Sequence, residues 1–198
     1  DLRGLKIRED SELIYGWHKS GHISRKVADT EDLFTRLGFD MVALDVNQGR
    51  GGERLHDLNY PIPEDLHGQF DLIFDCISNQ CFNIGQVMGS IALACRVGGL
   101  VLHTIPVNAV NQGYYNVCPT FYHDFYEANG FTLLKRETII GIYEKQGTAK
   151  LHSSKRCRRV PDDAMNLVLA RKDQAVEEVC WPMMRKFVDY PECKMLRD

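Results

Sequence analysis

Two aspartates each stand at the end of a short run that is typical of a strand. Asp45 ends the strand expected within Asp40–Val46, and Asp57 follows the run Glu53–His56. In an open α/β sheet, ligands bind beyond the carboxyl ends of the strands, where an acidic residue commonly accepts hydrogen bonds from a ribose. A second carboxylate can accept from an adenine amino group. The pair therefore indicates a nucleoside pocket, and for Asp45 a solvated strand-end or loop-capping role is the competing interpretation.

A polar and aromatic loop follows the apolar run Gly99–Ile105. It spans Pro106–Tyr115 and contains Asn108, Gln112 and Tyr114. Such loops, at the same edge of the sheet as the strand-end aspartates, often carry the residues that contact a substrate. These three side chains are our candidate substrate contacts, and no residue stands out as a general base.

Other chemistry has less support in the residue spacing. His56, His103 and His123 lack the short spacing of a metal site, so we expect core, edge or pocket histidines, with His103 a satisfied core residue in mid-strand. A thiolate at Cys76 or Cys81 would be stabilised near a helix N-terminus, but a small apolar wall residue is the better interpretation. No nucleophile elbow of the GxSxG kind occurs.

The run Phe70–Ser78, FDLIFDCIS, organises the expected fold. It is typical of a short buried strand of a parallel sheet, with the strand Asp40–Val46 before it and the strand Gly99–Ile105 after it. An amphipathic helix between Phe70–Ser78 and Gly99–Ile105 completes a βαβ unit. We therefore predict an α/β fold with a Rossmann-like doubly wound sheet, mostly parallel and closed by an antiparallel hairpin.

The remaining elements follow from capping residues and periodicity. A helix that Asp29 or Thr30 caps ends before Gly38, and the residues from Ile84 to Cys95 form the amphipathic helix. That second helix has Met88 in its core stripe, a capping box of Asn83 with Gln86, and Gly98-Gly99 as its stop. A further helix is expected over Thr120–Asn129; it buries Phe121, Tyr122, Phe125 and Tyr126 and ends at Gly130. After it we expect a strand over Phe131–Thr138, a long insertion loop over 139–163 and an antiparallel last strand over Ala164–Ala170. A C-terminal helical tail over 174–198, interrupted around Pro182, completes the prediction.

Composition sets the outer bounds. The 198 residues, 44% of them hydrophobic, suit one domain over 1–198. A net charge of -3 makes nucleic acid an unfavoured partner, and the basic run Lys150–Arg159 is better interpreted as a solvated loop. Seven scattered cysteines without a CxxC pair indicate a reducing cytoplasm, and no stretch is long and apolar enough to span a membrane.

The order of these features resembles the class I S-adenosylmethionine-dependent methyltransferases. More narrowly, HDLNYPIPEDLHGQFDLIFD, FNIGQ, VGGLVLHTIPVN and QGYYNVCPTFYHDFYEANGF are similar to a group of bacterial methyltransferase-domain proteins, over roughly Phe34–Phe131. This resemblance implies S-adenosylmethionine as cofactor. It implies these contacts: Asp45, with Val46 beside it, at the ribose hydroxyls, Asp57 and Leu58 at the adenine, and Asp75, Cys76 and Ser78 at the methionine end.

Three departures from the family pattern shape the functional hypotheses. The glycine-rich loop after the first strand is absent from the sequence as given, which opens at Asp1, so an N-terminally incomplete domain is one explanation. Gln80-Cys81 stands where relatives usually carry Glu-His, and Gln112 stands where they tend to have His. The first hypothesis is methyl transfer to a small molecule or saccharide, by positioning an aligned nucleophile. The alternative is a catalytically inactive, methyltransferase-like binding or assembly subunit with a protein partner or as a homo-oligomer. A nicotinamide-dependent oxidoreductase needs a glycine fingerprint too and has no family resemblance behind it.

Overall fold

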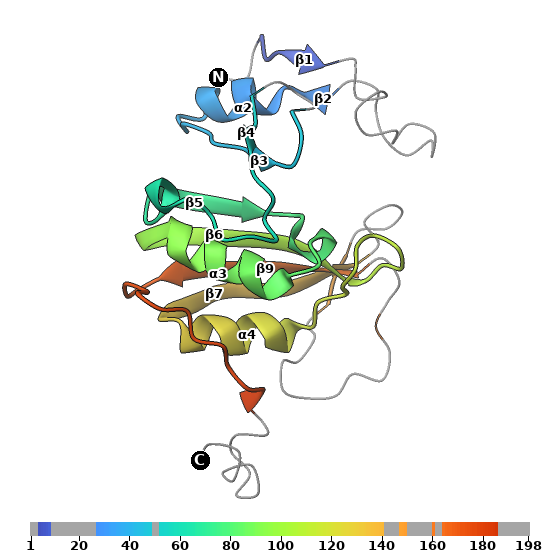
Figure 1. The fold of residues 1–198 in the computed structure, drawn as a ribbon. Helices are drawn as coiled ribbons and strands as arrows, with labels where there is room; N and C mark the ends of the chain where they lie inside the picture. The colour runs from blue at the N-terminus through green and yellow to red at the C-terminus, as the bar shows by residue number, and fades with distance from the viewer. Residues whose placement is uncertain are drawn as a thin grey trace, which may run out of the picture. The chain divides into compact units, whose positions relative to one another are not determined.

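The structure is a computed structural model that describes residues 4–8, 27–48, 52–140, 147–149, 160 and 164–185 (Figure 1). The chain divides into two compact units, Asp1–Asp57 and Leu58–Asp198. Most of the expected loop 139–163, its basic run and the end of the tail lie outside the described residues. The described elements form a mixed α/β structure. Among them, no helix combines the length and the apolar character that crossing a bilayer requires.

The described residues of unit 1 form two short two-stranded sheets and one helix. Strand β1 (Ile7–Arg8) pairs antiparallel with β2 (Val27–Ala28), and β3 (Leu44–Asp45) pairs in parallel with β4 (Arg54–Leu55). The predicted strands at 40–46 and 53–56 are therefore present but shorter than expected.

The helix of unit 1, α2, spans Thr30–Arg36 and has the caps that the sequence predicts. The Asp29 carboxylate accepts a hydrogen bond from the backbone N–H of Asp32 at 2.9 Å, which satisfies one of the donors that every helix start leaves unpaired. Gly38 follows the helix with a φ of 86°, a conformation that glycine adopts without a Cβ penalty.

Unit 2 is built on a five-stranded sheet with the order β5-β6-β9-β7-β8. Its strands are β5 (Phe70–Asp75), β6 (Cys95–Asn108), β7 (Phe131–Ile140), β8 (Gly147–Ala149) and β9 (Ala164–Lys172). Only β5 and β6 pair in parallel, whereas the other neighbours pair antiparallel. The prediction of a mostly parallel sheet is therefore wrong for this sheet.

The physical reason is the position of the last strand. Strand β9 is antiparallel to both β6 and β7, so β6 and β7 run in the same direction with β9 between them. Helix α3 (Ile84–Ala94) connects β5 to β6, and helix α4 (Pro119–Ala128) lies between β6 and β7 in the chain. The strand–helix–strand pattern was thus interpreted correctly, while the insertion of β9 makes the hydrogen-bonded pairs antiparallel.

The core of unit 2 lies between the sheet and these two helices. Figure 1 shows α3 beside β6 and α4 beneath β7. As the sequence predicts, Met88 of α3 and Tyr122, Phe125 and Tyr126 of α4 are buried. Asn83 caps α3 by accepting from the backbone N–H of Gln86 at 3.3 Å. The expected amphipathic faces are therefore the faces that pack.

Two local predictions in unit 2 are wrong. Helix α3 ends at Ala94 and β6 begins at once, so Gly98 and Gly99 lie inside a strand. They coincide with a register shift against β5 between Phe70 and Leu72, and a Cβ at Gly99 would lie 2.9 Å from the Phe70 carbonyl oxygen. The glycine pair thus serves a close approach of two strands rather than a helix stop.

The segment 174–184 of the tail is irregular, although Arg185, the last described residue, is helical, so the predicted tail helix is wrong for this segment. Its backbone bonds to a side chain instead of to itself: the Asn129 amide nitrogen donates to the Cys180 carbonyl at 2.9 Å, and the Cys180 N–H donates to the Asn129 amide oxygen at 2.8 Å. This pair of bonds holds the segment against the end of α4.

A buried ammonium group closes the carboxyl end of α3. Lys172, at the end of β9, is 4% exposed, and its Nζ donates to the carbonyl oxygens of Ala92 and Cys95 at 2.7 Å each. A cation at this position complements the partial negative charge of a helix C-terminus. Burial lowers the pKa of this ammonium group, so the two carbonyls are the partners that hold it in its charged form.

We expect Lys172→Met to lower the free energy of unfolding by about 1.5–3 kcal/mol, because hydrogen bonds from charged donors contribute on that scale. Urea denaturation followed by circular dichroism measures the change. Lys135→Met is the matched control: Lys135 is exposed and pairs with Glu137 at 3.2 Å, an interaction that contributes at most about 1 kcal/mol. Equal effects of the two substitutions would contradict the helix-capping role.

Candidate functional site

A chain of buried polar side chains crosses the core of unit 2, from the carboxyl end of β5 through the middle of β6 to α4. Asp75 Oδ2 lies 2.6 Å from His103 Nδ1, and His103 Nε2 lies 2.5 Å from the Tyr126 hydroxyl. The parallel register places Asp75 opposite His103, and α4 supplies Tyr126. The exposed fraction is 4% for Asp75 and 0% for the other two. We call these three residues the Asp75–His103–Tyr126 chain.

The other oxygen of Asp75 organises the backbone that follows β5. Oδ1 accepts from the N–H groups of Ile77 at 3.1 Å and Ser78 at 2.9 Å, and the chain then forms the single 3₁₀ turn η3 (Ser78–Gln80). Burial by itself raises the pKa of Asp75, but the hydrogen bond and charge of His103, with the Ile77 N–H, outweigh it, so the pKa lies below its usual range. The ionised carboxylate accepts from His103 Nδ1, which therefore carries a proton.

Tyr126 completes the chain as a neutral phenol. Burial, together with the charge of Asp75, holds the pKa of Tyr126 well above its usual range. All three side chains are closed to solvent. They therefore join two strands and a helix and do not form an open acid–base site. The prediction that His103 is a satisfied core residue is confirmed.

The cofactor residues predicted in unit 1 lie at one edge of the β3–β4 pair. Because these strands are parallel, Asp45 at the end of β3 and Asp57 just after β4 follow carboxyl ends that meet at the same edge. Both aspartates are half-buried, and Val46 is exposed. Asp45 Oδ1 accepts from the backbone N–H of Asn47 at 3.2 Å. Asp45 and Asp57 therefore lie at the same edge of the strand pair, as the sequence predicts.

The cofactor residues predicted in unit 2 have different surroundings. Leu58 packs against the core, and the carboxylate oxygens of Asp75 already accept from His103 and from the backbone. Cys76 is exposed. The Ser78 hydroxyl is buried and has no hydrogen-bond partner in the structure. A ligand at this turn would therefore meet the exposed Cys76 before it met the buried Asp75 carboxylate or the buried Ser78 hydroxyl.

An open depression of about 620 Å³ lies beyond the carboxyl ends of β5 and β6. Its lining residues come from η3 and from the loop after β6; they are Gln80, Asn111, Gln112, Gly113 and Tyr114. We call it the amide hollow. It contains two of the three predicted substrate contacts, Gln112 and Tyr114. The third, Asn108, is not a lining residue, and its amide nitrogen donates to the Val160 carbonyl at 3.3 Å.

Asn79 builds the hollow, and sequence reasoning did not single it out as a site residue. This residue is 1% exposed; its side-chain nitrogen donates to the Gln112 carbonyl at 3.0 Å, and its own carbonyl accepts from the Tyr114 N–H at 2.8 Å. Gly113 passes so close that a Cβ there would lie 2.7 Å from the Asn79 carbonyl oxygen. The available signal was its position, directly after the Phe70–Ser78 run.

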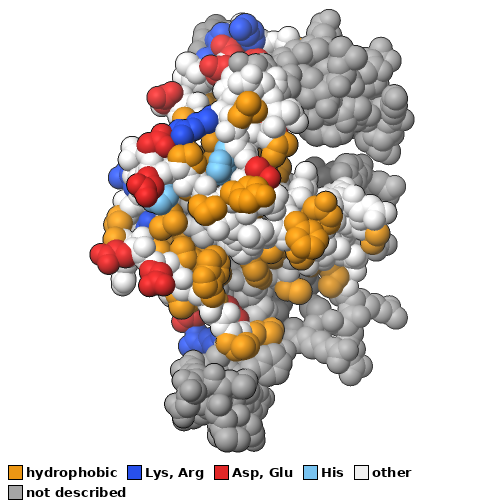
Figure 2. Space-filling view, in the orientation of Figure 1, with side chains coloured by type: hydrophobic (Ala, Val, Ile, Leu, Met, Phe, Trp, Pro, Cys, Tyr) orange, Lys and Arg blue, Asp and Glu red, His pale blue; other side chains and the backbone are white. Residues whose placement is uncertain are grey.

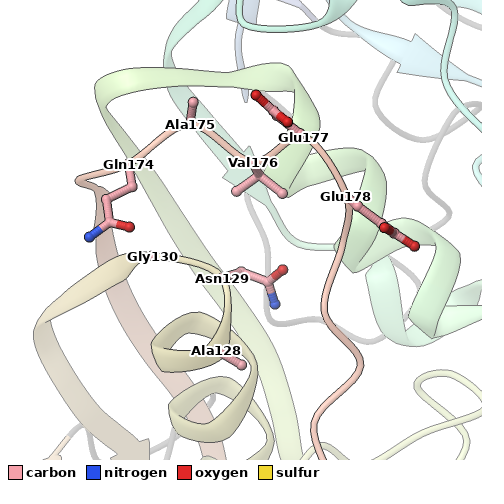
Figure 3. A pocket seen from close by; sticks show the side chains of 8 residues that line it. All are labelled: Ala128, Asn129, Gly130, Gln174, Ala175, Val176, Glu177 and Glu178. Carbon is pink, nitrogen blue, oxygen red and sulfur yellow. The ribbon is translucent and has the colours of Figure 1, made fainter.

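A second pocket, of about 350 Å³, lies at the other end of the sheet. Figure 3 shows residues 174–178 passing across the end of α4, with the side chain of Asn129 between the two segments. The Asn129 amide is used: it donates to the carbonyls of Phe125 and Cys180 and accepts from the Cys180 N–H. This pocket is a crevice between packed segments, whereas the amide hollow lies where the strand-end residues converge.

Comparisons with known proteins leave the assignment to geometry. No family model matches the chain, and no curated protein matches it. Within the described residues, no group of three or more His, Cys, Asp and Glu side chains could hold a metal ion.

Two aspartates on the same strand test the buried chain. We expect Asp75→Asn to lower the free energy of unfolding by about 1.5–3 kcal/mol at pH 7, because it removes a buried carboxylate that accepts hydrogen bonds from His103 and from two backbone N–H groups. The matched control Asp71→Asn removes a carboxylate that pairs with Arg96 on the exposed surface. This substitution should change the free energy of unfolding by at most about 1 kcal/mol. Urea denaturation measures both.

The pH dependence of the same comparison has a definite sign. Since the pKa of Asp75 is lowered on folding, its contribution is fully present above the pKa of an unfolded aspartate, about 3.9, and is lost as the pH falls through the lower folded value. The stability difference between the protein and Asp75→Asn should therefore be constant from pH 7 to about 5 and shrink at lower pH. A constant difference below pH 3 would contradict the assignment.

Two buried tyrosines on α4 form a second matched pair. The Tyr126 hydroxyl bonds to His103, whereas the Tyr122 hydroxyl is buried without a partner. We expect Tyr126→Phe to lower the free energy of unfolding by about 1–3 kcal/mol, since it leaves a ring nitrogen of His103 unpaired. Tyr122→Phe removes an unsatisfied group and should leave stability unchanged or slightly higher. The reverse order in thermal denaturation would show that the chain does not hold α4.

Proposed function

We propose that this chain is a methyltransferase of the class I type, which binds S-adenosylmethionine and transfers its methyl group to a small molecule or saccharide. The observation that carries the proposal is the parallel β3–β4 pair, whose carboxyl edge is followed by both Asp45 and Asp57. Two half-buried carboxylates at one such edge match the hydroxyls and amino group of a nucleoside.

The strand directions in unit 2 support a Rossmann-like architecture for the proposal. Strands β5, β6 and β7 share one direction, and α3 and α4 intervene between them in the chain. Strand β9 then supplies the antiparallel closing element, inserted between β6 and β7. Loops that follow parallel strands in this arrangement are the usual place for a ligand.

The residues present fit a reaction that depends on positioning. When bound, S-adenosylmethionine supplies an activated methyl group that needs only an aligned nucleophile. The amide side chains of the hollow and the Tyr114 hydroxyl can hold and orient an acceptor, and Asn79 fixes the two segments that carry them.

The alternative function is a methyltransferase-like binding or assembly subunit without catalytic activity. One observation favours it: among the described residues, the lining of the amide hollow contains no carboxylate and no imidazole. The buried imidazole of His103 cannot serve as the missing base, because both of its ring nitrogens are engaged. Ligand binding without chemistry is compatible with this lining.

A reducing, cytoplasmic setting belongs to the same proposal. Within the described residues, Cys95, Cys118 and Cys180 carry free thiols, as expected for a protein kept in a reducing compartment.

Calorimetric titration with S-adenosylmethionine and S-adenosylhomocysteine tests the proposal. We expect micromolar binding of both, and a loss of about tenfold or more in Asp45→Ala, since hydrogen bonds to a charged acceptor contribute about 1.5–3 kcal/mol. Asp40→Ala, an exposed aspartate of the same segment, is the control and should bind normally.

The outcomes separate the two functions. Binding that persists in Asp45→Ala would overturn the ribose assignment. No binding by the folded chain would rule out the methyltransferase proposal and leave the binding-subunit alternative.

A further inference from the structure

The segments that build the amide hollow are almost free of charge. From Cys76 to His123, Arg96 is the one side chain of the Asp, Glu, Lys and Arg set, in a chain where such residues make up 26%. Arg96 lies at the amino end of β6, away from the hollow, and pairs with Asp71. Figure 2 shows hydrophobic side chains in several separate groups on the described surface, with charged side chains scattered among them. The hollow's own segments therefore supply no cation for a phosphate or carboxylate.

The polar groups that the hollow does present are amides. Gln80, Asn111 and Gln112 each carry a carbonyl oxygen that accepts and an NH₂ group that donates two hydrogen bonds. Hydroxyl groups are also donors and acceptors at once, so an amide satisfies a hydroxyl in either role. A lining of amides thus matches a ligand rich in hydroxyls better than one rich in charge.

An aromatic face stands beside these amides. Tyr114 is 68% exposed and packs edge-on against Phe82, which is 73% exposed, with the ring centroids 5.5 Å apart. The face of an aromatic ring is electron-rich and attracts the weakly positive C–H groups on one side of a sugar ring. The aromatic side chains of this depression match the C–H face of a pyranose, and its amide side chains match the hydroxyl groups.

The hollow is also held in shape before any ligand binds. The Tyr114 N–H donates to the Asn79 carbonyl, Asn79 donates to the Gln112 carbonyl, and the Tyr115 hydroxyl donates to the Phe82 carbonyl at 2.8 Å. These bonds link the loop after β6 to the segment after β5. A preorganised site loses less conformational entropy on binding.

We infer that the amide hollow binds a neutral, polyhydroxylated ligand, a saccharide without phosphate or carboxylate groups. Tyr114 stacks on the sugar ring, and the amides of Gln80 and Asn111 bond its hydroxyls. Only the role of this ligand as methyl acceptor rests on the proposed function, because binding at the hollow uses no cofactor residue of unit 1.

Saturation-transfer difference NMR on the intact chain tests this inference, because it detects weak binding. The probes are the methyl glycosides of glucose, galactose, mannose and N-acetylglucosamine, with glucose 6-phosphate and glucuronate as anionic counterparts. We expect signals from at least one neutral glycoside, strongest on the ring C–H protons, and weaker signals from the anionic sugars.

Two variants locate the binding. Tyr114→Ala should weaken it about five- to tenfold, the loss expected for one aromatic contact. Tyr60→Ala is the control, since Tyr60 is similarly exposed at 65% and does not line the hollow. Gln80→Ala should weaken binding without removing the stacking signal from the ring C–H protons.

Three results would overturn the inference: no signal from any neutral glycoside, stronger signals from the anionic sugars, or equal binding by Tyr114→Ala and the intact chain. The titration with S-adenosylmethionine is read separately. Glycoside binding without cofactor binding would retain this inference and remove the methyltransferase proposal. Cofactor binding without glycoside binding would retain the methyltransferase proposal and remove this inference.

Discussion

The buried carboxylate of Asp75 sets the constraint on which the arrangement of unit 2 depends. An ionised group in a core is tolerated only when hydrogen bonds and opposite polarity replace the water that it has lost. Asp75 meets this requirement with His103 from the neighbouring strand and with the N–H groups of Ile77 and Ser78. His103 in turn requires Tyr126. One carboxylate therefore determines how β5, β6 and α4 meet.

The same constraint reaches the amide hollow through the backbone. Because Asp75 binds the N–H groups of the two residues that precede Asn79, it holds the start of η3, and Asn79 holds the loop that carries Gln112 and Tyr114. The hollow is thus two hydrogen-bonded steps from a buried charge, and the polar residues of its lining need no charge of their own to keep their places. The uncharged lining of the hollow is thus held in place by hydrogen bonds that begin at the buried Asp75 carboxylate.

Local features of the structure could be predicted from the sequence because they depend on neighbours in the chain. The caps at Asp29 and Asn83, the buried face of α4 and the positive φ of Gly130 all follow from interactions within a few residues. Features that depend on distant partners could not. The insertion of β9 between β6 and β7 is decided by which edge remains open after the helices have packed, and the sequence of β9 alone contains no information on it.

The site divides in the same way. The position of the loop after β6 could be predicted because it follows an apolar strand, and two residues predicted as substrate contacts, Gln112 and Tyr114, line the hollow. The role of Asp75 could not be predicted, since an aspartate at the end of a strand has the same appearance in the sequence whether it faces a ligand or a buried histidine 28 positions away. Asn79 was missed for a related reason: its function is to bond the backbone of a loop 33 positions later.

The neutrality of the hollow also bears on the chemistry that could occur there. A saccharide hydroxyl has to lose its proton when it accepts a methyl group, and among the described lining residues Tyr114 is the one with an ionisable side chain. Holding the sugar and removing its proton are therefore separate demands, and the lining meets the first by amides and an aromatic face. The Asp75–His103–Tyr126 chain cannot meet the second, since each of its members is buried and engaged within the core. The described lining of the hollow is consequently better suited to holding a neutral ligand than to removing a proton from it.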